Sequence, residues 1–129
     1  MKILWVVRPA QGGILQHLQS LLRGIPDLDI VLVAPRDLQD WAGSRRFFPL
    51  DLVDGLHLRR DLAATRQLRR VLRKEKPDVV HAHGLKAALI TSMALAPFRH
   101  PHFLFTAHNS LPQRSSKISQ WGTNAVQRW

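Results

Sequence analysis

The sequence contains no cysteine among its 129 residues. This absence excludes a disulfide framework, and it also excludes metal or redox sites that use thiolate ligands. Long hydrophobic runs are missing near the amino terminus, where the apolar run covers only Ile3 to Val7. Such a run is too short for the core of a signal peptide and far too short to span a bilayer. We therefore expect a soluble protein of the cytoplasm.

Acidic residues are scarce, with 9 Asp and Glu against 19 Lys and Arg, so the formal net charge is +10. This balance favours anionic partners, namely nucleic acid, acidic lipid or phosphorylated small molecules. Nucleic acid is disfavoured, because no aromatic residues are interleaved with the basic face of segment 61–76 and no DNA- or RNA-binding motif is present. We therefore expect no nucleic acid among the partners.

The order of apolar segments predicts an α/β fold. Short apolar runs that are typical of buried strands alternate with segments of helical periodicity. We expect strands at 3–7, 27–35, 49–53, 78–82 and 103–108, and helices at 14–24, 61–76, 85–96 and 115–129, with Asp61 as the N-cap of the second helix and the third largely buried. Alternating strands and helices predict a Rossmann-like open parallel sheet with helices on both faces, in a single domain over residues 1–129.

In such folds, ligands bind outside the carboxyl ends of the strands. Three segments follow predicted strands, at residues 8–13, 83–86 and 108–110. In the first of them, Gly12 and Gly13 would let the backbone approach a ligand, and the start of the next helix favours a phosphate. A tight turn without a ligand explains the same glycines, and both interpretations stay open.

Histidines are placed at two of these strand ends. His81 lies deeper in its strand, and we expect a core imidazole that is hydrogen-bonded to backbone. His83 follows at the strand exit beside Gly84, where a ligand could reach it. His108 ends the next strand, so the imidazoles of His83 and His108 could face one crevice, where each can donate, accept or carry a proton near neutral pH.

Several other site types are disfavoured by the spacing of residues. The pair of histidines in "HAH" has only Asp78 as a nearby acidic residue, and zinc sites draw on three or four ligands, so we expect no metal. The sequence also lacks the GxGxxG and GxxxxGK[ST] nucleotide-binding patterns and the GxSxG nucleophile elbow. A nicotinamide-binding protein and a serine hydrolase are therefore both disfavoured.

Three segments together resemble a known family. "MKILWVVRPAQGGILQHLQSLL", "KPDVVHAHGLKAALI" and "FLFTAHNSLP" are similar, in order and spacing, to the N-terminal domain of GT-B glycosyltransferases of the large retaining family 4. The resemblance covers nearly the whole chain. It implies a nucleotide sugar as co-substrate and no cofactor.

The resemblance also implies roles for individual residues. Gly12 and Gly13 would approach the donor diphosphate, and His108 would be the catalytic residue beside the transferred sugar. The remaining candidates would line the acceptor or sugar crevice, and they are Arg8, His83, Gly84, Lys86, Asn109 and Ser110. Relatives often have Thr or Gly where this chain has Asn109, which leaves the role of that residue open.

The family has a second domain that grips the nucleotide and carries an ExxxxxxxE-type motif. This chain has a single glutamate, Glu75, so the motif cannot be formed here. We therefore expect an incomplete acceptor-side part of a hexosyl-transferring enzyme that is inactive without its C-terminal domain.

Further expectations concern partners and a second class of function. A glycan or lipid-linked acceptor from polysaccharide or cell-envelope biosynthesis is expected, and the basic 61–76 helix favours an anionic membrane surface. The alternative hypothesis is a stand-alone interaction module. It would use the same crevice, or it would form an oligomer through the face of the last helix that carries Trp121 and Trp129.

Overall fold

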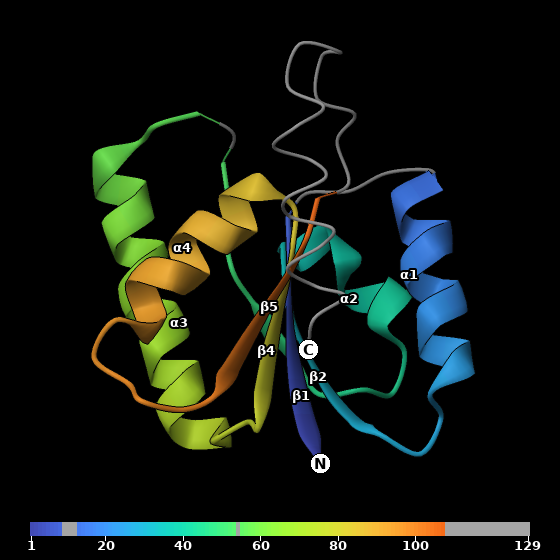
Figure 1. Ribbon diagram of the computed structural model, residues 1–129. Helices are drawn as coiled ribbons and strands as arrows, with labels where there is room; N and C mark the ends of the chain where they lie inside the picture. Colours follow the sequence, from blue (N-terminus) through green and yellow to red (C-terminus); the bar gives the residue numbers. More distant parts are fainter. Residues whose placement is uncertain (9–12, 54, 108–129) are drawn as a thin grey trace, which may run out of the picture.

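A computed structural model describes residues 1–8, 13–53 and 55–107 (Figure 1). The predicted helix at 115–129, with Trp121 and Trp129, lies outside these residues. The elements in chain order are β1 (Lys2–Val7), α1 (Gly13–Gly24), β2 (Asp29–Ala34), the 3-10 helix η1 (Arg36–Leu38), α2 (Gln39–Ala42), β3 (Phe47–Pro49), α3 (Leu58–Glu75), β4 (Val79–His83), α4 (Leu85–Leu95) and β5 (His102–Thr106).

The strands form one parallel sheet in the order β3-β2-β1-β4-β5. This arrangement confirms the predicted Rossmann-like class. The chain runs outward from β1 to β2 and β3 and then returns to place β4 on the other side of β1. The carboxyl ends of β1 and β4 therefore flank the point where the strand order reverses, which is where α/β sheets bind ligands.

Each face of the sheet has its own core. Leu4, Val6 and Val80 belong to a core with α3 and α4, while Trp5 and Leu32 belong to a second core with α1 and α2. Neighbouring residues alternate between the two cores because successive side chains of a strand point to opposite faces. Figure 1 shows α1 on one side of the sheet and the α3–α4 pair on the other.

The third strand differs from its prediction. We expected it at 49–53, but β3 ends at Pro49, and Leu50 and Leu52 are buried residues of the following loop. The Leu50 backbone N–H still donates to the Ala34 carbonyl at 2.8 Å. An alternating apolar pattern indicates which side chains are buried, but not whether the backbone pairs with a neighbouring strand. Here Leu50 and Leu52 are buried although they follow the end of β3.

The predicted N-cap of α3 was also wrong. The helix begins at Leu58 with His57 as N-cap, and Asp61 lies inside it. The Asp61 carboxylate accepts a hydrogen bond from the His57 backbone N–H at 3.2 Å. The end of α3 matches the expected stop, because Lys76 adopts a left-handed conformation (φ 46°) immediately before Pro77.

Helix α4 is less buried than its apolar sequence predicts. Leu85 is 66% exposed and Leu89 is 41% exposed, while the buried side includes the polar residues Lys86 and Thr91. In the described part of the chain, no helix has the length and apolar character needed to cross a bilayer.

Candidate functional site

The ends of three neighbouring strands come together at the carboxyl edge of the sheet. Val7 of β1 pairs in register with His83 of β4, and His83 pairs with Thr106 of β5. Two backbone hydrogen bonds continue this alignment past the strands, from Arg8 N–H to the His83 carbonyl (3.4 Å) and from Gly84 N–H to the Thr106 carbonyl (2.9 Å). The chain segments that leave β1, β4 and β5 therefore start side by side.

Five of the predicted site residues lie within the described part of the chain, and four lie outside it. Gly13 is the first residue of α1, and Arg8, His83, Gly84 and Lys86 are also described. Gly12, His108, Asn109 and Ser110 lie outside the described residues.

Position 84 favours glycine for two reasons, its backbone conformation and its close contact with Arg8. Gly84 caps α4 with φ 100° and ψ 157°, a conformation that residues with a Cβ rarely adopt. A Cβ at this position would also meet the Arg8 side chain, with Cγ at only 2.8 Å and Cδ in contact. Arg8 therefore packs against the backbone at the start of α4, and these two predicted residues are brought together.

The two histidines of β4 have the opposite exposure to that predicted. His83, which we expected within reach of a ligand, is fully buried. Its ring lies 4.6 Å from that of Trp5 and 4.0 Å from that of His81, measured between centroids. Strand alternation predicts that the two imidazoles share one face of the sheet, and the structure shows that this is the α1 face, where the Trp5 indole lies against His83.

His81 is half-buried, and its imidazole forms a side-chain hydrogen bond in addition to its ring contacts with Trp5 and His83. Its Nε2 atom lies 2.7 Å from the Thr106 hydroxyl oxygen, in a hydrogen bond whose direction depends on the imidazole tautomer. This bond joins β4 to β5 on the α1 face of the sheet. The sequence predicted a backbone partner for His81, whereas this partner is a hydroxyl on the neighbouring strand.

Lys86 forms a buried ion pair at the start of α4. Its Nζ atom lies 2.6 Å from Asp61 Oδ1 and also donates to the Gly55 carbonyl at 2.6 Å. The hydrogen bond from Lys86 lowers the pKa of Asp61 below its ordinary value, despite the opposing effect of burial. The pair ties the first turns of α3 and α4 to the loop at Gly55.

Sequence reasoning missed this ion pair, since Asp61 was assigned to capping and Lys86 to the crevice. The available signal was Lys86 as the single charged residue of the helix at 85–95, because a buried cation needs an anionic partner. The crevice role of Lys86 stays a prediction. Among residues 1–8, 13–53 and 55–107, no group of three or more His, Asp or Glu side chains could hold a metal ion.

A comparison with protein families identifies the chain. Residues 11–129 match the family model of Glycosyltransferase Family 4. The chain belongs to glycosyltransferase family 4. This result confirms the resemblance to an N-terminal GT-B domain that the three sequence segments indicate. No curated protein sequence matches the chain.

Solved structures with the same fold support the architecture of this family 4 domain. UDP-GlcNAc 2-epimerase from Methanocaldococcus jannaschii is 16% identical, with a TM-score of 0.66 over 98% of this chain. MurG from Acinetobacter baumannii is 15% identical, with a TM-score of 0.65 over 94% of this chain. A structure of the M. jannaschii epimerase in complex with UDP-GlcNAc and UDP has 15% identity and a TM-score of 0.67 over 98% of this chain.

These likenesses are likenesses of fold, because the sequence identity is low. The chain spans 37%, 39% and 38% of the three structures, in the order given. The predicted GT-B-type Rossmann-like fold is confirmed over nearly the whole chain.

Proposed function

We propose that this family 4 domain forms the acceptor side of a nucleotide-sugar-dependent glycosyltransferase. The observation that carries the proposal is the alignment of the β1, β4 and β5 ends at the point where the strand order reverses. In the proposal, Arg8 and Gly84, which lie in close contact, form one wall of the crevice, and the buried His83 precedes Gly84 at the end of β4. The segments that carry Gly12 and His108 leave from the same edge.

The proposed chemistry follows from the charges that develop during sugar transfer. Negative charge grows on the leaving diphosphate, and backbone N–H groups at the start of α1, from Gly12 and Gly13, suit it. Positive character grows on the sugar ring. In the proposal, His108 bonds the sugar hydroxyl groups as a neutral imidazole and holds the reacting geometry, so that no second cation is placed beside the ring.

We further propose that the chain does not transfer sugar by itself. Its single glutamate, Glu75, is bound at 2.6 Å by Arg46 and at 3.4 Å by Lys2, near the amino end of the sheet. It is therefore not placed for the nucleotide-gripping role of the acidic motif in a second domain. Closure of two domains on the donor supplies the geometry that transfer needs.

The test combines a transfer assay with an acceptor-binding measurement on the purified chain. With radiolabelled nucleotide sugars and a panel of saccharide and lipid-linked acceptors, we expect no labelled product. In saturation-transfer NMR we expect at least one acceptor to bind, and Arg8→Ala to weaken that binding several-fold. The matched control is Arg36→Ala, which changes an exposed arginine in η1. Turnover by the chain alone, or equal binding by both variants, contradicts the proposal.

An anionic membrane surface is the proposed location of the acceptor. The Asp61–Lys86 ion pair joins α3 and α4 near their starts. Exposed leucines and arginines occur on the first half of α3, at Leu56 just before it, and on the first half of α4. We call this set the leucine–arginine surface, and it consists of Leu56, Leu58, Leu62, Leu85, Leu89, Arg59, Arg60 and Arg66. Leucines that enter the interface and arginines that meet anionic headgroups are the two components of peripheral membrane binding.

Vesicle sedimentation tests the membrane proposal. We expect binding to vesicles that contain anionic lipid, weaker binding to purely zwitterionic vesicles, and a marked loss for Leu58→Ser with Leu62→Ser. Leu58 is 76% exposed, so its replacement should leave the fold intact. The control is Arg45→Gln, an exposed cation in the segment between α2 and β3. Equal binding to both vesicle types, or no effect of the leucine substitutions, counts against this surface.

A further inference from the structure

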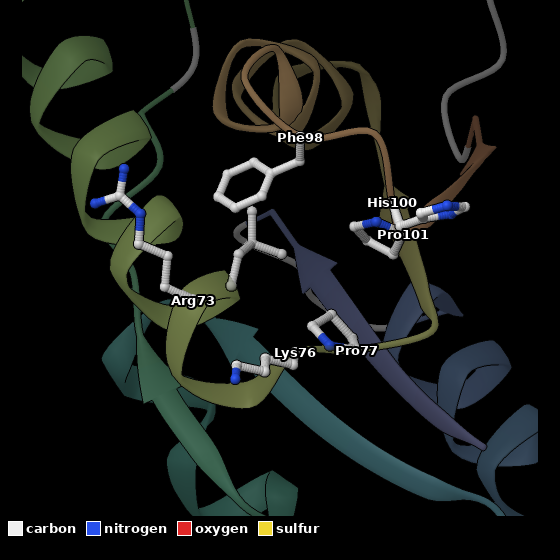
Figure 2. Close-up of a pocket in the computed structure, with 7 residues that line it drawn as sticks. Arg73, Lys76, Pro77, Phe98, His100 and Pro101 are labelled. Atoms are coloured by element: carbon white, nitrogen blue, oxygen red, sulfur yellow. The ribbon is translucent and has the colours of Figure 1, made fainter.

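A pocket lies at the amino-terminal edge of the sheet, at the opposite edge from the proposed crevice. It is a half-open pocket of about 530 Å³ between the end of α3 and the segment that joins α4 to β5. Figure 2 shows Arg73 and Lys76 on one side of this pocket, Phe98 above them, and His100 and Pro101 on the other side. Its volume falls in the range of small-molecule sites. We call it the amino-edge pocket.

The inner surface of the pocket is apolar and well supported. Leu72 and Pro77 are buried, and Phe98 is half-buried and packs against the α3–α4 core. The Phe98 backbone N–H donates to the Leu95 carbonyl at 2.8 Å, which fixes the turn after α4. An apolar floor held in this way favours a hydrocarbon or aromatic body of a ligand, because burial of apolar surface is favourable.

The rim of the pocket is basic. Arg73, Lys76 and His100 have exposed side chains, and none of the seven residues that line the pocket is acidic. The two carboxylates that adjoin the pocket in sequence are engaged elsewhere. Glu75 binds Arg46 and Lys2, and the Asp78 carboxylate accepts the Lys2 backbone N–H at 2.8 Å.

The C-terminal end of α3 restricts the positions at which an anion can bind in this pocket. Carbonyl groups at a helix C-terminus repel negative charge. At this helix end the Lys76 backbone N–H caps the Leu72 carbonyl at 2.9 Å. The favourable position for an anionic head is therefore the outer rim, where the long side chains of Arg73 and Lys76 reach, while the body of the ligand covers Phe98.

We propose that the amino-edge pocket binds a small amphiphilic anion, with an alkyl or aryl body on the Phe98 floor and a phosphate or carboxylate head at the basic rim. This site is separate from the proposed sugar-transfer crevice, and it does not depend on that function. Both parts of the ligand are needed, since an exposed cation alone contributes little and an apolar surface alone has no charge preference.

The test uses octyl phosphate below its critical micelle concentration, with ¹⁵N-labelled chain and NMR detection. We expect saturable shifts of the Lys76 and Phe98 backbone amides, with a dissociation constant at least tenfold lower than for inorganic phosphate or octyl glucoside. Octanoate, which has a carboxylate head, should produce shifts at the same amides. Equal affinity for octyl glucoside, or shifts confined to the leucine–arginine surface, overturns the proposal.

Matched variants separate the pocket from general charge. We expect Arg73→Gln and Lys76→Asn each to weaken octyl phosphate binding by roughly three- to tenfold, as expected for loss of a charge-assisted contact. Asn tolerates the left-handed backbone at position 76. Arg70→Gln, an exposed arginine of α3 that does not line the pocket, should bind as the unaltered chain does. An equal loss in Arg70→Gln assigns the binding to net charge and contradicts the site.

Discussion

At the scale of a single residue, Gly84 matters both for stability and for the proposed crevice, because it caps α4 and contacts Arg8. Its φ of 100° and the Arg8 side chain above it both disfavour any Cβ. We expect Gly84→Ala to lower the free energy of unfolding by about 2 kcal/mol, since strained backbone positions cost roughly 1–3 kcal/mol each. Chemical denaturation followed by circular dichroism measures the change.

The control for this prediction is Gly24→Ala. No atom lies within 4 Å of the Cβ that would be added at Gly24, and its φ is not in the left-handed range. This variant should be neutral or slightly stabilised. Adding Arg8→Ala to Gly84→Ala should recover part of the loss, because it removes the steric contact and leaves the backbone strain. Equal stability of Gly84→Ala and Gly24→Ala would contradict the claim that strain and the Arg8 contact disfavour a Cβ at position 84.

The Asp61–Lys86 ion pair leads to a second prediction, which concerns the stability of single-residue variants. Both side chains are more than nine-tenths buried, at 9% and 8% exposed. Lys86→Met leaves Asp61 as a buried carboxylate without its cation, so we expect a loss of about 3 kcal/mol in unfolding free energy at neutral pH. Arg66→Gln, a change of an exposed cation on α3, should shift stability by less than about 0.5 kcal/mol. Similar values for the two variants would show that the pair is not buried in solution.

The same pair contributes to the pH dependence of stability. The hydrogen bond from Lys86 holds the folded-state pKa of Asp61 below its ordinary value. The stabilisation from this group is therefore present above the unfolded pKa and is lost as the pH falls through the folded pKa. Denaturation from pH 6 down to pH 2 should show a fall in stability in the acid range that is smaller in Lys86→Met. An unchanged acid limb in that variant contradicts the assignment.

At the scale of elements, Arg69 contributes two hydrogen bonds to the contact between α3 and α4. Its guanidinium donates to the carbonyls of Met93 (2.8 Å) and Ala94 (3.3 Å) at the end of α4. A cation at this position satisfies terminal carbonyls and complements the helix dipole. We expect Arg69→Met to cost about 1–2 kcal/mol in stability and to raise hydrogen exchange in the last turn of α4.

The adjacent arginine provides the comparison. Arg70 is exposed and lies one residue further along the same helix, so Arg70→Met removes an equal charge without removing these bonds. It should change neither stability nor exchange in α4 by a measurable amount. Faster exchange in both variants would mean that charge alone, and not the capping bonds, stabilises the end of α4.

The sequence predicts these elements with different success, for physical reasons. Strands β1, β2, β4 and β5 were predicted from their continuous apolar runs. Strands β1, β2 and β4 are largely buried, whereas the edge strand β5 is exposed at His102 and Phe103 and half-buried after them. Strand β3 was misplaced, since the apolar residues that follow it are buried in a loop. Alternation predicts that His81 and His83 share one face, but it does not predict the contact of His83 with Trp5, which is distant in sequence.

For the whole molecule, the strand order decides which predicted residues can meet. Local patterns alone do not give the order β3-β2-β1-β4-β5, yet this order brings the ends of β1, β4 and β5 together. The candidate site was therefore predicted from the general rule for α/β sheets and from the family resemblance. The Asp61–Lys86 pair and the amino-edge pocket could not be predicted in this way, because each joins segments through tertiary packing.

The most direct test of the central claim is an NMR titration of the ¹⁵N-labelled chain with the acceptor that binds in the saturation-transfer measurement. If the loops at the carboxyl edge form one crevice, the backbone amides of Gly12, Gly13, Gly84 and Asn109 should shift together with a single dissociation constant. The amides of Lys76 and Phe98, at the other edge of the sheet, should not move. No saturable shift, or shifts that avoid the ends of β1, β4 and β5, would contradict the account.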